Sequence, residues 1–218
     1  MEWTERVKKN ILPVSEENTD VRKALDEWIY EGFMYDIETP EEVCELCDHL
    51  HIRYQFEIIN INNQNILLIG SECISRFKIS VVGPRGEKLS YDDAKKKVSK
   101  DRNKLVTEAK IKNLINSLVK LASVDADFDI ENFIKYFKEY GAFTPKQLAT
   151  LIWRLEKYKI EFKKSHFKMS LKRNKDKQQL FDMEDWKIKT LWDCFSNSQK
   201  EIYNDQMKRK AFINQLPL

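Results

Sequence analysis

The sequence predicts an α+β protein whose strands are confined to its first half and whose second half is mostly α-helical. Two runs between residues 52 and 69 alternate or cluster β-forming residues, which is typical of short strands. From residue 90 onward, apolar residues recur at helical spacing instead. The 218 residues include only 5 Gly and 5 Pro, and this scarcity of turn residues favours helix over an all-β sandwich.

The first segments of the chain are expected to be helices. Residues 2–12 form a short amphipathic pattern, and Pro13 ends it because proline cannot continue a helix. A second helix is expected to be capped by Thr19 and to stop at Gly32. Its apolar face would comprise Val21, Ala24, Leu25, Trp28 and Ile29.

A β-hairpin is expected next. Residues 52–58 alternate apolar and polar side chains and predict a half-buried strand, and residues 66–69 return as a second strand. The asparagine-rich stretch of residues 62–65 makes the turn between them. Ser71 is then expected to cap a short helix, and residues 79–82 to form a further strand.

The rest of the sequence predicts a series of helices. Ser90 begins a basic helix, a separate helix is expected over residues 105–122, and a third over residues 130–137 closed by Gly141. We place the division of the chain near residue 102. This gives a first domain of residues 1–102 and a helical domain of residues 103–218.

The clearest helix start is at Thr144, which is followed by a proline and, three residues on, by Gln147. Ser196 and Gln199 repeat this capping pattern. Between the two starts, residues 166–172 alternate apolar with polar side chains, which predicts a strand or an extended arm.

Composition indicates a folded protein: 42% of the residues are hydrophobic and 33% are charged. No apolar run approaches the roughly 18 residues of a membrane helix, and the first residues lack a signal-peptide pattern, so we expect a cytoplasmic protein without membrane contact. In that compartment, 4 cysteines are more plausible as metal ligands or buried thiols than as disulfides. The isolated Cys194 is expected in the core.

The other cysteines have the spacing of a zinc site. Cys44 and Cys47 form a Cys-x-x-Cys turn, and Cys73 falls in the first turn of a predicted helix, where the helix dipole favours a thiolate. A knuckle, a hairpin and a ligand at a helix start are the layout of treble-clef domains. We therefore predict a small zinc-bound β-hairpin module flanked by helices, with Zn²⁺ held by these cysteines and His49, or His51 as the alternative. The other interpretation is that Cys73 is a core residue and the knuckle a tight turn.

These residues resemble a family of uncharacterised bacterial and phage proteins with a zinc-finger-like module. The likeness lies in Glu27-Trp28, C-E-L-C-x-H, I-R-Y-Q-F-E-I and I-G-S-E-C-I-x-R-F, and covers roughly residues 20–80. The resemblance implies a small zinc module, often on mobile elements, and no settled activity. Asp48 stands where the family often has glycine after the second cysteine, and aspartate tolerates a left-handed backbone better than most residues.

No catalytic residue is predicted, and we lean against an enzyme. Glu72 beside Cys73 resembles the glutamate of zinc deaminases, but the His-x-Glu and Pro-Cys-x-x-Cys elements of that signature do not occur, which favours structural zinc. Asp125, Asp127 and Asp129 begin like a calcium loop but lack its glycine and its final glutamate. We therefore predict that they form a cluster at a helix N-terminus.

A basic segment of residues 157–177 holds 9 basic and 2 acidic side chains, interleaved with Tyr158, Phe162 and Phe167. Cations that bind phosphates and aromatic faces that stack on bases are the composition of a nucleic-acid surface. The alternative is a solvated lysine-rich arm whose aromatic residues are merely buried. The predicted DNA or RNA contacts are Lys157, Lys159, Lys163, Lys164, His166, Lys168, Lys172, Arg173, Lys175 and Lys177.

Two functions are therefore expected. The first is a non-enzymatic, zinc-stabilised nucleic-acid-binding protein associated with a phage or mobile element. The second is a protein-interaction module, such as a phage-borne regulator or inhibitor of a host protein. Residues 1–43, with 12 acidic and 5 basic side chains, motivate the second because they also carry side chains favoured at interfaces: Trp3, Trp28, Tyr30, Phe33, Met34 and Tyr35. The oligomeric state is not indicated.

Overall fold

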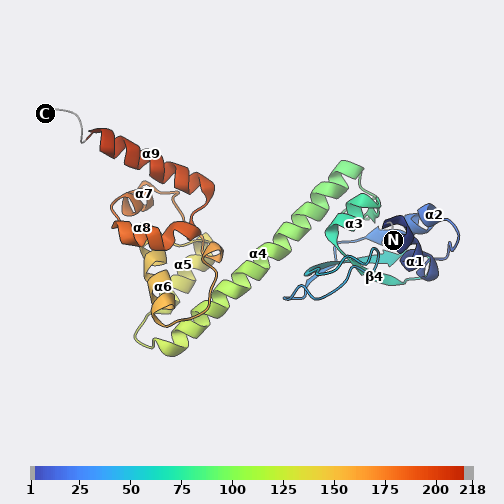
Figure 1. The fold of residues 1–218 in the computed structure, drawn as a ribbon, viewed down its shortest axis with the longest axis horizontal. Coiled ribbons are helices and arrows are strands. Elements are labelled where there is room, and N and C mark those ends of the chain that lie inside the picture. The colour runs from blue at the N-terminus through green and yellow to red at the C-terminus, as the bar shows by residue number, and fades with distance from the viewer. Residues whose placement is uncertain (1–2, 214–218) are drawn as a thin grey trace. The chain divides into compact units, whose positions relative to one another are not determined.

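The computed structural model describes residues 3–213 and separates into two compact units, residues 1–109 and residues 110–218 (Figure 1). The first is called the N-terminal unit and the second the helical unit. The sequence placed the division near residue 102, whereas the two units meet inside helix α4 (Tyr91–Val124). The predicted α+β class, with a small sheet in the first half and helices after it, is confirmed.

The described part of the N-terminal unit is built on a five-stranded sheet in which β3 (Tyr54–Asn60) is central. The predicted hairpin pairs β3 with β4 (Ile66–Ile69), and Phe56 lies opposite Ile69. On its other edge β3 pairs antiparallel with two short strands, β1 (Trp28–Tyr30) and β2 (Met34–Asp36). Strand β5 (Ser80–Val81) adds to β1 in parallel.

The predicted second helix is wrong in its extent and its cap. Helix α2 (Val21–Asp26) is capped by Asp20, whose carboxylate accepts the amides of Arg22 and Lys23, and it ends before Trp28. Trp28 and the two residues after it form β1 instead. Pairing with β3 and complete burial of the Trp28 ring outweigh the helical spacing, because strand formation is decided by tertiary packing.

Two further short helices belong to this unit, besides the first part of α4. Helix α1 (Trp3–Ile11) ends in a 3₁₀ turn at Leu12–Val14, as the proline predicted. Helix α3 (Ser71–Arg76) follows β4, and its N-cap is Gly70 rather than the predicted Ser71. The largest fully buried side chains of the unit are Trp28, Tyr30, Phe56, Ile11, Leu46, Ile58, Ile69 and Ile74.

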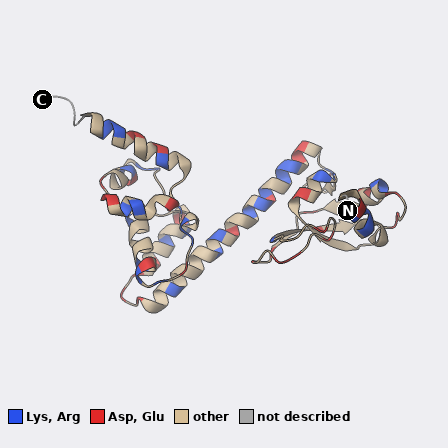
Figure 2. Ribbon diagram, viewed as in Figure 1, with Lys and Arg blue, Asp and Glu red and all other residues tan. Residues whose placement is uncertain are grey.

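The two helices expected between residues 90 and 122 are one continuous helix, α4. The polar stretch at its middle contains neither glycine nor proline, so nothing there ends a helix. An ion pair between Lys97 and Asp101, 2.8 Å apart, supports it, and Asp101 also accepts the hydroxyl of Tyr30 at 3.0 Å. Lysine and arginine recur along the first half of this helix (Figure 2).

The helical unit contains five further helices within its described residues: α5 (Ile130–Tyr140), α6 (Pro145–Lys157), α7 (Asn174–Phe181), α8 (Asp185–Leu191) and α9 (Asn197–Ile213). Three predicted boundaries are confirmed. Gly141 closes α5 with φ +66°, Thr144 and Gln147 form a capping box at α6, and Ser196 and Gln199 form another before α9.

An extended segment crosses the helical unit between α6 and α7. Phe167, Met169 and Leu171 are buried, while Lys168 and Lys172 are exposed, which is the alternation that the sequence predicted. Two backbone hydrogen bonds to Phe143 fix the segment. The Phe143 amide donates to the carbonyl of Lys168 at 2.9 Å, and the Ser170 amide donates to the carbonyl of Phe143 at 2.8 Å. It is thus an anchored segment with one isolated β-bridge.

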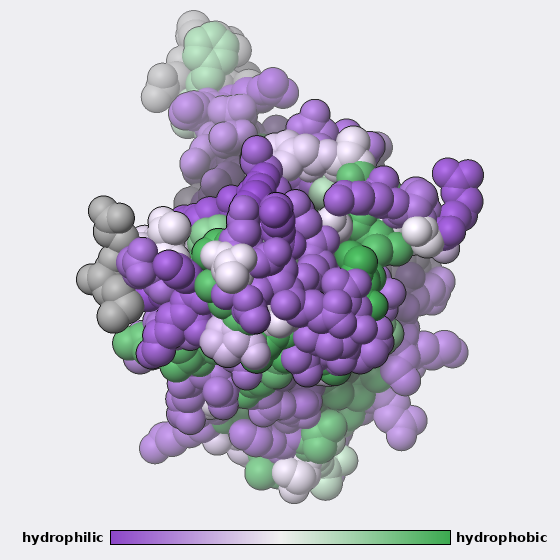
Figure 3. Space-filling model, turned by 90° about the vertical axis from the view of Figure 1, so that its right-hand side faces the viewer, coloured by the Kyte–Doolittle hydropathy of each residue, from purple (hydrophilic) through white to green (hydrophobic). Residues whose placement is uncertain are grey.

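The outer face drawn in Figure 3 is mostly hydrophilic, with apolar side chains exposed in small separate areas. Among the described residues, no helix combines the length and the apolar character that crossing a membrane requires.

Replacing the cap of α6 tests the fold. Thr144→Ala removes the hydroxyl that accepts the Gln147 amide at 3.2 Å, so we expect the free energy of unfolding to fall by about 1 kcal/mol in chemical denaturation of the whole chain. Thr107→Ala, at an exposed position inside α4, is the matched control and should change it by less than about 0.5 kcal/mol. Equal effects of the two substitutions would contradict the role of the cap.

Candidate metal centre and nucleic-acid interface

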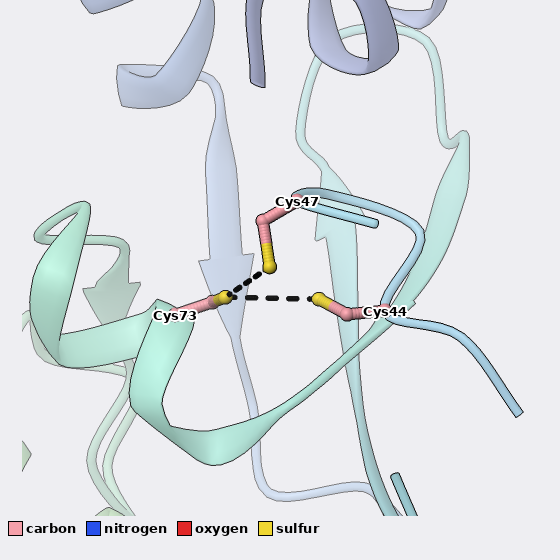
Figure 4. Close-up of side chains that lie close together, drawn as sticks. All are labelled: Cys44, Cys47 and Cys73. Atoms are coloured by element: carbon pink, nitrogen blue, oxygen red, sulfur yellow. Dashed lines mark hydrogen bonds between the residues drawn. The ribbon is translucent and has the colours of Figure 1, made fainter. Parts of the chain in front are cut away.

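Three cysteines from two separate elements come together in the N-terminal unit (Figure 4). Cys44 and Cys47 lie in the turn before β3, and Cys73 lies in the first turn of α3. The Cys73 sulfur is 3.6 Å from that of Cys44 and 3.3 Å from that of Cys47, and all three sulfurs lie within 4.8 Å of one another. All three side chains are buried. Such a group can hold a metal ion.

The sulfur separations are those of a coordination site. Thiolates at about 2.3 Å from a tetrahedral ion lie about 3.8 Å from one another, close to the separations found here. A disulfide would need about 2.0 Å, and all of these cysteines are free thiols. The interpretation of Cys73 as an ordinary core residue does not account for three sulfurs pointing toward one point (Figure 4).

The turn that carries Cys44 and Cys47 is held by its own backbone. The carbonyl of Cys44 accepts the amides of Cys47 at 3.3 Å and Asp48 at 2.9 Å, and the amide of Cys44 donates to the carbonyl of His49 at 2.9 Å. Asp48 has φ +57°, so the aspartate adopts the left-handed conformation that the turn requires. The amide of Gly70 donates to the Cys44 sulfur at 3.4 Å.

Two contacts outside the turn fix its position. The side-chain amide of Asn10, on α1, donates to the carboxylate of Asp48 at 2.8 Å and to the carbonyl of Leu46 at 3.4 Å. The amide of Glu45 donates to the carbonyl of Leu68, on β4, at 3.1 Å, and the Glu45 carboxylate accepts the Leu68 amide at 2.5 Å. Sequence reasoning missed Asn10, since nothing in the pattern of α1 indicates a partner so far along the chain.

The protein's own groups favour a thiolate at one of the three positions. A hydrogen bond from the Cys73 thiol, with backbone amides of Gly70, Leu46 and Cys47, lowers the pKa of Cys44 to about 5 against the opposing effect of burial. The same hydrogen bond, together with burial, raises the pKa of Cys73. Burial also raises the pKa of Cys47. A divalent cation would stabilise the charged form of all three.

The two candidate histidines lie at the edge of this cluster. His49 and His51 are exposed and line the same cleft of about 400 Å³ as the three cysteines. Neither belongs to the group whose ligand atoms lie within 4.8 Å of one another. The Nδ1 atom of His51 is 3.2 Å from the carbonyl oxygen of Pro40. The geometry therefore brings three predicted ligands together and leaves the choice of a fourth as a prediction.

The same cleft is lined by cationic side chains. Arg53 forms a two-pronged pair with Asp36, at 2.7 and 2.8 Å, and Arg76 lies over the ring of Trp3 at 4.0 Å. Arg102 and Glu72 complete this part of the wall. A metal in the cluster would thus lie beneath a cleft with a positive rim.

The remaining cysteine and the aspartate cluster have structural roles. Cys194 is buried in the core of the helical unit, as predicted, and burial raises its pKa to about 12. Asp129 caps α5 by accepting the amide of Asn132, and Asp125 pairs with Arg154. The prediction of a cluster at a helix N-terminus is confirmed for Asp129 only, because Asp125 lies directly after the last residue of α4.

The structure sorts the predicted nucleic-acid contacts into three groups. Lys164 pairs with Glu156 at 2.9 Å, and Arg173 holds the buried Asp176 at 2.8 Å, so both have structural partners. Lys177 and His166 are half-buried. Six others are exposed and pair with no carboxylate among residues 3–213: Lys157, Lys159, Lys163, Lys168, Lys172 and Lys175.

The prediction that aromatic rings of the basic segment stack on bases is wrong for Phe167. Its ring is fully buried between Phe143, at 6.3 Å between ring centroids, and Phe162, at 5.6 Å. Phe162 and Tyr158 are half-buried against the same core. These aromatic residues anchor the basic segment, so stacking on bases would need other rings.

Comparison of the chain with protein-family models, curated proteins and solved structures found no match. Fold and cluster together define an α+β protein with a buried three-thiol site able to hold a metal ion.

Substitution of one ligand tests the metal centre. Cys47→Ala should abolish stoichiometric metal in protein purified without chelator and should destabilise the N-terminal unit, because two sulfurs cannot hold the ion alone. Cys194→Ala is the matched control, a buried thiol outside the cluster, and should retain the metal. Elemental analysis and thermal unfolding of both variants measure this, and metal retained by Cys47→Ala would count against the site.

Proposed function

We propose that this protein binds nucleic acid through the lysines of residues 157–177 and is stabilised by a structural zinc ion. The zinc ligands are Cys44, Cys47, Cys73 and one imidazole, that of His49 or alternatively His51. The observation that carries the nucleic-acid function is the set of six exposed, carboxylate-free lysines on an anchored backbone. The phage or mobile-element association implied by the family resemblance remains a prediction.

Zinc is favoured by the donor set. Thiolates are soft ligands that select zinc, copper(I) or iron–sulfur clusters, and a Cys₃His set is a common structural zinc site. The ion would join the turn before β3 to the start of α3, two segments that flank the hairpin. Because these sulfurs are buried and share one centre, the zinc contributes to folding of the N-terminal unit.

Histidine substitution identifies the fourth ligand. His49→Ala should lower zinc affinity by more than about 100-fold, since loss of a direct ligand exceeds the 10- to 100-fold effect of a supporting residue. His51→Ala is the matched control, an exposed histidine of the same cleft, and should have a smaller effect. Competition with a chromogenic chelator measures both affinities. The reverse order would assign the ligand to His51, and two unchanged affinities would exclude both.

The basic segment has the properties of a phosphate-binding surface. Its apolar side chains are buried in the core of the helical unit, so its lysines project from a backbone whose position is fixed. Less conformational entropy is then lost on binding than for a flexible lysine-rich arm. The six exposed cations without a carboxylate partner are all lysine, which favours contact with phosphates over reading of base edges.

A second candidate function, protein binding by the N-terminal unit, has less support. Trp28 and Tyr30, two of the aromatic residues that motivated it, are fully buried. Trp3, Phe33 and Tyr35 remain exposed. Capture of a host protein that survives nuclease treatment, and is lost on Phe33→Ala, would favour this function.

Charge removal tests nucleic-acid binding. The triple variant Lys163→Gln, Lys168→Gln, Lys172→Gln should weaken binding and reduce the slope of log affinity against log salt by about 2 to 3, because each phosphate contact contributes about 0.7 to 0.9. Lys8→Gln, Lys9→Gln, Lys88→Gln removes the same charge from exposed lysines of the N-terminal unit and is the matched control. Electrophoretic mobility shifts over a salt series measure both. Equal losses in the two triple variants would show only a net-charge effect.

A further inference from the structure

The helical unit contains a groove that no prediction from the sequence anticipated. It has a volume of about 750 Å³ and is formed by residues of α6, α7 and α8 with the turn between the last two. We propose that this groove takes the bases of single-stranded nucleic acid, stacked on Trp153 and Trp186. This inference rests on the proposed nucleic-acid function and names its substrate class.

Two tryptophan rings line the groove and remain open to solvent. Trp153, on α6, is 45% exposed, and Trp186, on α8, is 52% exposed. A ligand that covers these rings would remove their apolar area from water, which favours binding. Every base has a π-face that can stack on such a ring, whatever the sequence of the strand.

Cations lie over both rings, and the Arg154 guanidinium is a second cation over Trp153, at 5.8 Å. The Lys157 ammonium lies 5.3 Å from the centroid of Trp153, and the Lys187 ammonium lies 5.1 Å from that of Trp186. A strand whose base stacks on either ring would therefore place a phosphate near a lysine. Lys146 and Lys175 add two exposed cations at the groove. Neither pairs with a carboxylate among the residues that the structure describes.

The groove is continuous with the proposed phosphate-binding surface. Lys175 belongs both to residues 157–177 and to the lining of the groove, and Lys157 connects the start of the same segment to Trp153. A strand held by the exposed lysines of the extended segment could thus continue into the groove. This continuity, with the excess of cations, favours nucleic acid as the occupant.

Two residues that line the groove also carry buried polar atoms without a partner. Within residues 3–213, the buried side-chain polar atoms without a partner are Nε of Arg154 and Oε1 of Gln179, and both residues line this groove. One is a donor and the other an acceptor, and leaving such atoms unpaired is unfavourable. Both atoms are buried, so they do not face a ligand in the groove.

The acidic side chains of the groove do not oppose this occupant strongly, because they are engaged by neighbours. The carboxylate of Asp182 accepts the side-chain amide of Gln178 at 2.8 Å, and its charge is paired with Lys210 at 4.0 Å. Glu184 accepts the indole N–H of Trp186 at 2.5 Å and pairs with Lys187 at 3.2 Å. A duplex keeps its base faces stacked inside and cannot use the two rings, so the geometry favours a single strand.

The test compares single-stranded oligothymidine with a duplex of the same length. Trp153→Ala and Trp186→Ala should each lower affinity for the single strand by roughly tenfold, and leave duplex affinity within about twofold. Phe212→Ala removes an exposed aromatic ring, 65% exposed, that does not line the groove, and is the matched control. Trp153→Phe with Trp186→Phe keeps aromatic faces and should retain single-strand binding, which separates stacking from misfolding.

The outcomes distinguish failure of the groove assignment from failure of the proposed nucleic-acid function. If the two alanine variants bind the single strand as tightly as the unchanged protein, while the lysine triple variant does not, the groove assignment fails and the nucleic-acid function stands. If the unchanged protein binds neither strand form at low salt, both fail. If the two alanine variants lose binding of an acidic peptide but bind oligothymidine as tightly as the unchanged protein, the groove is a peptide site and the inference is overturned.

Discussion

Convergence of the sulfurs of Cys44, Cys47 and Cys73 on one point is the constraint on which the N-terminal unit depends. Strands β1, β2 and β5 have three, three and two residues, and sheets with such short strands need support from elsewhere. The sulfurs join the turn before β3 to the start of α3, the helix that leads into β5. Around them, Asn10 and Glu45 tie the same turn to α1 and to β4. Cross-linking by a metal would thus add to contacts that already orient the ligands.

Several local signals in the sequence predicted local structure, although the predicted caps Thr19 and Ser71 were each displaced by one residue. The capping box at Thr144, the left-handed Gly141 and the left-handed Asp48 each depend on groups within a few residues, and each is found. The Cys-x-x-Cys spacing likewise predicted the cluster. What could not be predicted depends on partners distant in the chain. Trp28 lies in a strand because of β3, and Asp101 on α4 contacts Tyr30, 71 residues away.

A lysine-rich segment with interleaved aromatic residues has the same sequence pattern whether its rings stack on bases or are buried in the core. In the segment of residues 157–177, the ring of Phe167 anchors the backbone in the core while neighbouring lysines face solvent. The exposed rings near these lysines come from α6 and α8, on either side of the segment in sequence. Trp153 and Trp186 show no shared pattern along the chain, so only the fold brings them to one groove.

An odd number of thiols has a consequence for the chemistry of the cluster. Oxidation joins sulfurs in pairs, so a disulfide between any two of these cysteines leaves the third without a partner in the N-terminal unit. Cys194, the remaining cysteine, is buried in a different core and cannot supply one. An oxidised chain would therefore retain one unpaired thiol, buried in the N-terminal unit. The zinc ion proposed here would protect against this by occupying all three sulfurs at once.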